Sequence, residues 1–327
     1  MVNTESLATS EGTGQQMILK SRIFQGARLA LMGLAAIACS PSVEEAPREA
    51  TLEPDPPHQC DFCERLNEPT EPFRIYGDTY YVGTAMISSV LIASDDGLVL
   101  VNGGMTQTAQ QIADNIKTLG FSLSELKLIV NTHAHFDHAG GIAALARATG
   151  ATVATSTRGA EALEQGRPTE DDPQRGLEDN VFPVVPEVRV VADGGTVSAG
   201  GIDLTAHYTP AHTPGSVAWT WRSCEDGECL DVVFADSFST RSAPEFRFTD
   251  AEGRIENFRS AIATVAALPC DILLAPSPLS FGVKEKLAAR AENPEPNPFI
   301  DPAACRTYAE AATAGLDKRI AEEQAAQ

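Results

Sequence analysis

Short segments in which apolar residues cluster or alternate with polar ones follow one another along most of the chain, and they predict strands. The first half contains "FRIYGDTYYVGT", "SSVLIASDDGLVLVNGG" and "LKLIV", which are separated by Gly and Asp turns. The second half contains "VRVVADGGTVSAGGIDLTAHYT", "SVAWTWRS" and "LDVVFADSFS". Because these runs are rich in β-branched and aromatic residues, we expect strands in all of them.

Helical spacing interrupts the strands in both halves. The segment "TAQQIADNIKTLG" has apolar residues four positions apart and ends at a glycine, and "AGGIAALARATG", "RIENFRSAIATVAALP" and "ACRTYAEAATAGLDKRIAEE" also favour helices. On the last segment one apolar stripe is formed by Tyr308, Ala312, Leu316 and Ile320, which predicts core packing. Strands followed by helices in each half predict an α/β protein of two β-sheets packed face to face, with helices on the outer faces.

The beginning of the chain differs from the rest. We expect a signal peptide within residues 1–39. From residue 17 the chain carries basic residues, then an apolar run, then small residues, which is the layout of a secretory signal, and Met17 fits its start better than Met1. The apolar run is short for a membrane span, but an anchor helix is the alternative. "AAIAC" resembles a bacterial lipoprotein box, which would make Cys39 the lipidated first residue, and simple cleavage after Ala38 is the alternative.

Composition separates a tether from the main folded domain. Residues 40–70 are rich in Pro and Glu, so we expect a tether, and we expect one folded domain over residues 71–327. The chain of 327 residues is 43% hydrophobic, enough for a globular core. Its 24 Lys and Arg against 45 Asp and Glu give a net charge of −21 with no basic stripe, which argues against nucleic-acid binding.

Export changes the interpretation of the cysteines, because thiols pair in an oxidising compartment. Apart from Cys39 there are six, and proximity along the chain predicts three disulfides: Cys60–Cys63, Cys224–Cys229 and Cys270–Cys305. "CDFC" could instead be a redox motif or half of a zinc site. A structural role is favoured, because no second CxxC with metal-like spacing exists and no thioredoxin-like βαβ unit surrounds it.

The segment "NTHAHFDHAGG" concentrates side chains that bind metals. His133 and His135 alternate directly after "LKLIV", so they leave the strand end on the same side and can share one metal. Asp137 is the next residue in this every-second-position alternation, so its side chain is expected on the same side. His138 lies at the start of a predicted helix and points in another direction, which allows a second metal a short distance from the first. His212 in "TPAHTPGS" offers a third imidazole; three imidazoles on zinc would lower the pKa of bound water to about 7 and make hydroxide available as the nucleophile.

Four segments together resemble the metallo-β-lactamase superfamily, and within it the third subclass of the class B β-lactamases. They are "NTHAHFDHAGG", "TPAHTPGSVAWTW", "FADSFS" and "LPCDILLAPSP", and the resemblance runs from about Phe73 to the C-terminal helix. It implies an αβ/βα sandwich of two mixed β-sheets with the metals at one sheet edge, in a periplasmic enzyme that opens β-lactam rings.

The resemblance also implies residue roles. His133, His135 and His212 would hold the first zinc, and Asp137 and His138 would contribute to the second, with Asp137 also acting in catalysis by orienting the attacking water. Ser237 and Ser239 match polar positions that help to receive the substrate carboxylate, although both are equally well explained as turn caps.

Two positions depart from the family pattern. Ser277 stands where the family has a histidine at the second zinc, and serine is a poor zinc ligand. Asn102 stands where the superfamily usually has an aspartate that supports the ligands. We therefore predict one tightly bound zinc and a weak second site, in which water or Asp236 fills the gap.

The two remaining histidines are expected to have no direct part in the site. His207 shares a strand face with polar residues and is predicted to face solvent or to lie behind the ligands, and His58 in the predicted tether is expected to be solvated.

We thus predict a zinc-dependent hydrolase with weak or narrow activity on small-molecule β-lactams. It would be a monomer in the periplasm, anchored to the membrane if Cys39 is lipidated. The alternatives are a lactone or thioester hydrolase of the same superfamily that uses Asp236 as a bridging ligand, or a non-catalytic zinc-binding lipoprotein.

Overall fold

The computed structural model describes residues 50–326. The predicted signal segment, Cys39 and the first part of the predicted tether lie outside these residues. Within residues 50–326, no helix combines the length and the apolar character that crossing a membrane requires.

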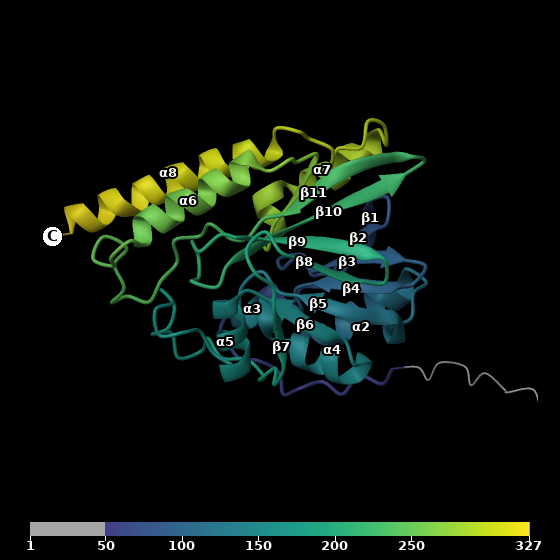
Figure 1. The fold of residues 1–327 in the computed structure, drawn as a ribbon, viewed down its shortest axis with the longest axis horizontal. Coiled ribbons are helices and arrows are strands. Elements are labelled where there is room, and N and C mark those ends of the chain that lie inside the picture. The colour runs from purple at the N-terminus through teal and green to yellow at the C-terminus, as the bar shows by residue number, and fades with distance from the viewer. Residues whose placement is uncertain (1–49, 327) are drawn as a thin grey trace, which may run out of the picture. The chain divides into compact units, whose positions relative to one another are not determined.

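Two mixed β-sheets form the centre of the fold (Figure 1). The seven-stranded sheet runs in chain order through β1 (Phe73–Tyr76), β2 (Thr79–Tyr81), β3 (Val90–Ser94), β4 (Gly97–Val101), β5 (Leu126–Val130), β6 (Thr152–Thr155) and β7 (Val188–Val190). Its strands are antiparallel from β1 to β4 and parallel from β4 to β7.

The five-stranded sheet has the order β12-β11-β10-β9-β8. Its strands are β8 (Thr196–Ala199), β9 (Ile202–Tyr208), β10 (Val217–Glu225), β11 (Glu228–Phe234) and β12 (Ile272–Leu274). Only the β11–β12 pair is parallel. Because β11 and β12 run in the same direction, the segments that follow them emerge at the same sheet edge.

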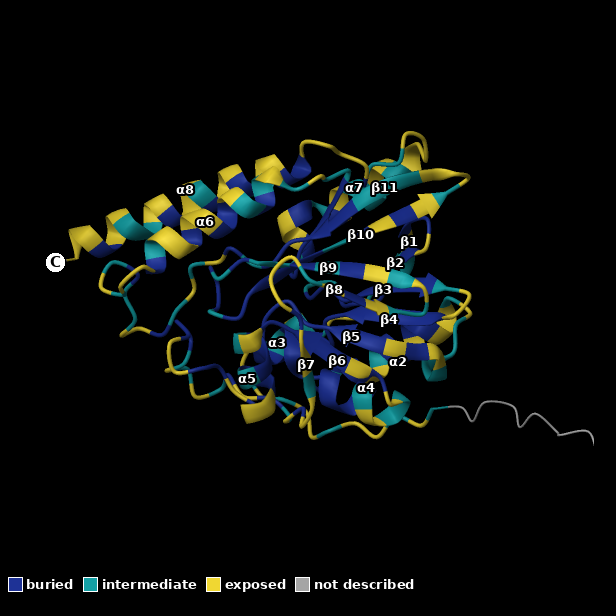
Figure 2. Cartoon of the chain, viewed as in Figure 1, coloured by how far each residue is buried: buried dark blue, intermediate teal, exposed yellow. Residues whose placement is uncertain are grey.

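Helices cover the outer faces of both sheets. One apolar cluster joins the seven-stranded sheet to α2 (Thr108–Thr118), α4 (Ile142–Thr149) and α5 (Thr157–Gln165). A second fills the space between the sheets and extends to α6 (Arg254–Ala267) and α8 (Ala304–Ala325). Short elements complete the fold: α1 (Cys63–Leu66), η1 (Leu123–Glu125), α3 (Phe136–Ala139), η2 (Pro278–Phe281) and α7 (Val283–Glu292). The predicted αβ/βα sandwich is confirmed, and Figure 2 shows the central strands β4 and β5 mostly in the dark blue of buried residues.

The predicted elements are present, but several others had no clear pattern. The α8 stripe is confirmed: Leu316 is fully buried, and Tyr308 and Ile320 pack against the same cluster. The sequence prediction missed β6, β12, α5 and α7. The strands β6 and β12 are short apolar runs and α7 has little helical periodicity, whereas α5 is a short amphipathic helix whose pattern was overlooked.

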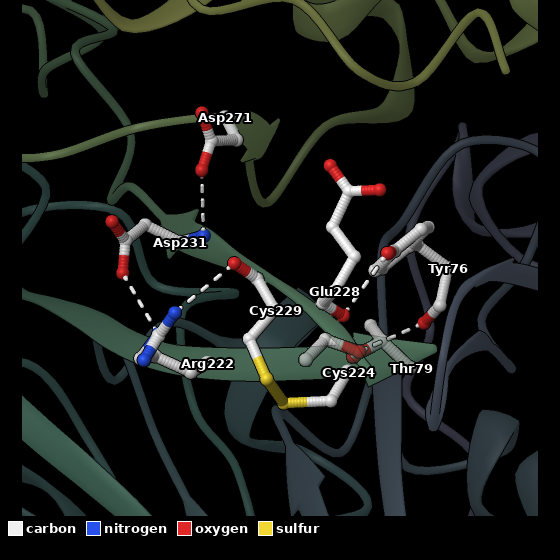
Figure 3. The surroundings of a disulfide bond; sticks show 9 residues. Tyr76, Thr79, Arg222, Cys224, Glu228, Cys229, Asp231 and Asp271 are labelled. Atoms are coloured by element: carbon white, nitrogen blue, oxygen red, sulfur yellow. Dashed lines mark hydrogen bonds and ion pairs between the residues drawn. A yellow bond between two sulfur atoms is a disulfide. The ribbon is translucent and has the colours of Figure 1, made fainter. Parts of the chain in front are cut away.

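All three expected disulfides are present in the structure. Cys224 and Cys229 lie directly opposite each other on β10 and β11 (Figure 3). Beside them the Tyr76 hydroxyl donates to the Glu228 carbonyl at 3.2 Å, which ties this hairpin to the end of β1. Cys270–Cys305 connects the segment before β12 to the beginning of α8.

Residues 50–70, which were expected to belong to a tether, pack against the domain. Arg147 on α4 contacts the Asp55 carboxylate at 2.9 Å, and the Thr108 hydroxyl at the start of α2 donates to Asn67 Oδ1 at 2.6 Å. Cys63 is buried in the apolar cluster of the seven-stranded sheet, and Phe62 packs against it. A Pro-rich composition therefore did not exclude specific packing, because a few apolar and polar side chains of the segment contact the domain.

The end of α8 anchors a loop that leads from β11 to α6. The buried Glu323 carboxylate accepts hydrogen bonds from the backbone N–H groups of Phe248 and Thr249 at 3.0 and 2.9 Å, and from Arg319 Nε at 2.6 Å. Burial alone would raise the pKa of Glu323, but Arg319 and these N–H donors outweigh it and lower the pKa from 4.5 to about 2.

We expect Glu323→Gln to lower the free energy of unfolding by about 2 kcal/mol near neutral pH, because two buried N–H groups lose a charged acceptor. The folded-state pKa lies below the unfolded-state value, so the stabilisation is complete above pH 4.5 and is lost as the pH falls toward about 2. Denaturant unfolding should show the difference from wild type shrinking over that interval. Glu322→Gln, at an exposed site beside Lys318, is the matched control. An equal loss in both variants would contradict the assignment.

Candidate metal centre

The ends of the two sheets bring the histidine segments together. After β5 the chain leaves the strand through Asn131 and Thr132, and α3 begins at Phe136, so Asp137 and His138 lie on this short helix. His212 lies in the turn between β9 and β10. The Val217 N–H donates to the Thr132 carbonyl at 2.8 Å, which joins the two turns directly.

Close backbone packing fixes the histidine segment. The Gly103 N–H donates to the His138 carbonyl at 2.9 Å, and a Cβ at Gly141 would lie only 2.2 Å from the Gly103 carbonyl oxygen. A side chain at Gly141 would therefore separate the two segments.

Asn102 supports the same turn with its amide. Its Oδ1 accepts hydrogen bonds from the Thr132 N–H at 2.9 Å and from Asn131 Nδ2 at 3.0 Å. Its φ of 63° lies in the left-handed region, which asparagine tolerates better than most residues. Asn102 therefore holds the turn before His133 through hydrogen bonds that need no charge.

Three buried imidazoles converge on one point. The ring centroids of His133, His135 and His212 lie 4.8 to 5.0 Å apart, and one ligand nitrogen from each lies within 4.8 Å of the others. All three side chains are almost completely buried. This is the cluster that the sequence predicted for the first metal.

Each ring is held by a hydrogen bond at the nitrogen that faces away from this point. His133 Nδ1 lies 2.6 Å from Asp236 Oδ1, and His212 Nδ1 lies 2.8 Å from the Ser239 carbonyl oxygen. His135 Nε2 lies 3.2 Å from both oxygens of Asp172. Since these acceptors require N–H donors, the lone pairs of His133 Nε2, His135 Nδ1 and His212 Nε2 remain for a cation.

The protonation equilibria agree with this arrangement. Burial lowers the pKa of His212 to about 3, with further lowering by His135 and His133, so this ring is neutral. Burial alone would raise the pKa of Asp236, but His133 outweighs it and lowers the pKa to about 2. Asp236 therefore carries the negative charge that keeps a proton on His133 Nδ1.

A second group of ligand atoms adjoins the first. Atoms of His133, Asp137 and His138 lie within 4.8 Å of one another, and Asp137 Oδ2 lies 3.3 Å from His138 Nε2. Burial alone would raise the pKa of Asp137, but His138 holds it well below the usual range, so the carboxylate is ionised. Within residues 50–326 no further histidine, cysteine or carboxylate belongs to this group.

The residues after β11 lie beside the first cluster, as their position in the sequence suggested. Ser237 Oγ accepts from the Ser239 N–H at 3.2 Å, and Ser239 Oγ accepts from the Arg241 N–H at 3.2 Å. Both serines therefore act as turn caps, but each hydroxyl keeps its own hydrogen for donation. Asp236 binds the outer nitrogen of His133 and is not part of the second group.

The sequence alone leaves open whether the polar stretch "RPTEDDPQRGLEDN" lies near the site or is merely solvated, and in the structure it contributes directly to the centre. Asp172, Gln174 and Asn180 belong to the polar stretch between α5 and β7, yet all three are buried. Gln174 Nε2 lies 3.4 Å from His135 Nδ1 and 3.3 Å from His212 Nε2, where both lone pairs point, and Asn180 Oδ1 accepts from the Phe136 N–H at 3.1 Å. Nothing in the sequence separates these residues from an ordinary solvated loop.

The structure also places His207 and His58, which were expected to have no direct part in the site. His207 on β9 is half-buried, and its Nε2 lies 2.9 Å from Thr220 Oγ1, outside both ligand groups. The expectation of a solvated His58 was wrong, because its ring stacks on Phe136 with centroids 4.2 Å apart. Burial lowers the pKa of His58, against the opposing effects of Asp179 and Asp137.

The centre fits a zinc ion. His133 Nε2 and His138 Nδ1 are buried and have no hydrogen-bond partner within the described part of the chain, which is costly unless a ligand satisfies them. Three imidazole ligands would leave one position for water or substrate, which is the donor set of catalytic zinc sites.

Comparisons with known proteins agree with this geometry. The family model described as the metallo-beta-lactamase superfamily matches residues 82–226. Rm3 metallo-beta-lactamase is 41% identical with a TM-score of 0.79, over 81% of this chain and 99% of its own. A subclass B3 metallo-beta-lactamase isolated from a soil metagenome library is 44% identical with a TM-score of 0.77, over 80% of this chain and 100% of its own.

A curated relative matches a smaller part of the chain. Hydroxyacylglutathione hydrolase of Anaeromyxobacter dehalogenans (strain 2CP-C) is 37% identical over 93 residues. The match covers 28% of this chain and 28% of that protein.

We expect Asp236→Asn to weaken zinc binding at the three-histidine cluster by about 10- to 100-fold, because the amide removes the charge that orients His133. Competition with a chromophoric chelator measures this affinity. Asp231→Asn, on strand β11 shortly before Asp236 and beside the exposed Arg222, is the control and should bind zinc like the wild type. If Asp236→Asn bound zinc as tightly as Asp231→Asn, Asp236 would have no role in holding His133.

Proposed function

Because the chain belongs to the metallo-β-lactamase superfamily, we propose that it is a zinc-dependent hydrolase that opens the ring of β-lactam antibiotics. The observation that carries this proposal is the convergence of His133, His135 and His212, whose ligand atoms lie within 4.8 Å of one another. The similarity to metallo-beta-lactamases over 81% of the chain supports the substrate class.

The residues around the cluster have separate tasks. When bound, zinc supplies Lewis-acid chemistry that polarises a carbonyl and activates water for attack near neutral pH. Asp137 is ionised because His138 lowers its pKa, so its carboxylate can accept a hydrogen bond from the attacking water and orient it. The Gln174 amide lies against two of the nitrogens that would hold zinc, His135 Nδ1 and His212 Nε2, so it would have to move aside for a cation to bind there.

Ser237 and Ser239 suit the carboxylate of a β-lactam. Each uses its oxygen to accept a backbone N–H and retains its hydroxyl hydrogen, so each can donate to an anion. Because the Ser239 carbonyl also holds His212, the serine loop and the metal cluster are fixed relative to each other.

The second site would bind zinc weakly. Ser277 follows β12, and the Ala235 N–H donates to the Leu274 carbonyl at 2.9 Å, so Ser277 and Asp236 emerge at the same edge of the sheet. A serine there gives a neutral hydroxyl in place of an imidazole. Since a second metal normally anchors the substrate carboxylate and stabilises the leaving nitrogen, we expect weak or narrow activity.

A thioester or lactone hydrolase is the second candidate, motivated by the match to a hydroxyacylglutathione hydrolase. Its support is weaker for two reasons. The match covers only 28% of that protein, and the carboxylate of Asp236, the candidate bridging ligand, is hydrogen-bonded to His133 Nδ1.

The proposed enzyme would act as a monomer in an oxidising compartment. The segment before Cys39 would export it, and the three disulfides suit such a compartment.

Hydrolysis of a penicillin, a cephalosporin, a carbapenem, a thioester and a lactone by the zinc-loaded protein tests this function. We expect at least one β-lactam to be hydrolysed faster than the thioester and the lactone. We also expect His212→Ala to lower kcat/KM for that β-lactam by about 100-fold or more. His207→Ala is the control and should retain activity. Faster thioester or lactone hydrolysis would favour the second candidate. No hydrolysis by a protein that still binds zinc through His212 would indicate a non-catalytic zinc-binding protein.

Ser277→His tests the second site. The added imidazole should raise zinc affinity beside Asp137 and His138 by about tenfold or more, because it replaces a poor ligand by a good one. Zinc content after dialysis measures this change, with Ser280→His in the same short helix segment as the control. Unchanged zinc content in Ser277→His, or two tightly held zinc ions in the wild type, would contradict the assignment.

A further inference from the structure

A third group of metal-ligating side chains lies on the N-terminal segment, outside the hydrolytic centre. Ligand atoms of His58, Cys60 and Cys63 lie within 4.8 Å of one another. The two cysteines form the "CDFC" motif, which hydrolysis does not use, and they are joined by a disulfide. In this oxidised form the sulfurs cannot act as thiolate ligands.

His58 is held in place independently of the disulfide. Its backbone N–H donates to Gln107 Oε1 at 3.0 Å, and Gln107 Nε2 donates to the His58 carbonyl at 3.2 Å. Its ring stacks on Phe136 at an interplanar angle of 19°. These contacts involve neither sulfur, so opening the disulfide leaves the imidazole beside the cysteines.

The His58 ring also has an unused polar atom. His58 Nε2 is buried, and it has no hydrogen-bond partner within residues 50–326. A buried imidazole nitrogen without a partner is unfavourable, and a bound cation would satisfy it.

The cysteines are held close by a tight turn. The Cys63 N–H donates to the Cys60 carbonyl at 3.2 Å, and the two Cα atoms are 5.1 Å apart. Cys63 is buried at the start of α1, and the adjacent Phe62 ring contacts both Phe136 and the Arg241 guanidinium. The backbone contacts that form this turn remain when the S–S bond breaks, so both sulfurs stay on the same side of the segment.

We propose that, when the Cys60–Cys63 disulfide is reduced, His58, Cys60 and Cys63 form a site for a thiophilic divalent cation such as zinc or cadmium. Two thiolates and one imidazole are the donors that such cations prefer, and water completes a tetrahedral shell. The segment then has two alternative crosslinks, a covalent one and a metal-mediated one.

The chemistry balances with a dithiol as reductant. The dithiol transfers two electrons and two protons to the S–S bond and becomes a cyclic disulfide, while Cys60 and Cys63 become thiols. The cation then displaces one proton from each thiol, and the two thiolate charges balance its own. Because the same sulfurs serve both states, bound cation excludes the disulfide and should slow its re-formation.

Cadmium titration of the zinc-loaded full-length protein tests the proposal. The protein is reduced with dithiothreitol and freed of reductant without oxygen, and cadmium–thiolate formation is followed by its ultraviolet charge-transfer absorbance. Cys60→Ser/Cys63→Ser, reduced in the same way, is the matched control, because it keeps the hydrolytic centre and the remaining cysteines. We expect the reduced wild type to bind an additional cadmium ion compared with the reduced double variant, and the oxidised wild type to lack it. Equal binding by the reduced wild type and the double variant would overturn the proposal.

A single substitution tests the imidazole. His58→Ala, reduced in the same way, should bind the additional cadmium at least about tenfold more weakly, because one of three ligands is lost. Gln59→Ala, at the exposed neighbouring position, should bind it like the wild type. If His58→Ala and Gln59→Ala bound cadmium equally well, His58 would not be a ligand and the three-residue site would be refuted.

Discussion

The structure depends on one arrangement: each of the three converging imidazoles donates its outer N–H to a fixed acceptor. Asp236 serves His133, the Ser239 carbonyl serves His212, and Asp172 serves His135. Without these acceptors a buried histidine could rotate or carry its proton on the wrong nitrogen. With them, three lone pairs point to the same place before any cation arrives, so little reorganisation is needed when it binds.

The fold supplies these acceptors from separate parts of the chain. Asp236 and Ser239 follow β11, whereas Asp172 lies in the loop after α5. A backbone hydrogen bond from the Val217 N–H to the Thr132 carbonyl joins the turns at the ends of the two sheets. The Tyr308 hydroxyl on α8 donates to the Asp236 carbonyl at 2.9 Å. The helix that completes the outer layer therefore also fixes an acceptor at the centre, which links packing to the chemistry.

Strands followed by helices in each half predicted two packed sheets, and the resemblance to the metallo-β-lactamase superfamily implied the αβ/βα sandwich. The dense histidines after an apolar strand, which are an unusual pattern, predicted the cluster that brings His133, His135 and His212 together. The sequence did not reveal Asp172 or Gln174, since a buried polar loop and a solvated one have the same composition. His58 was misjudged for the same reason: its Pro-rich surroundings indicate poor core formation, but its contacts are one aromatic stack and two hydrogen bonds to Gln107. Such contacts depend on partners distant in the chain, which no local pattern encodes.

X-ray absorption at the zinc edge of the singly loaded protein tests the central claim most directly, because it reports the ligands of the metal without requiring a substrate. The account predicts three imidazole ligands and one further oxygen ligand, all at about 2.0 to 2.1 Å. A sulfur ligand at about 2.3 Å, or fewer than three imidazoles, would show that the cation binds elsewhere and would contradict the account.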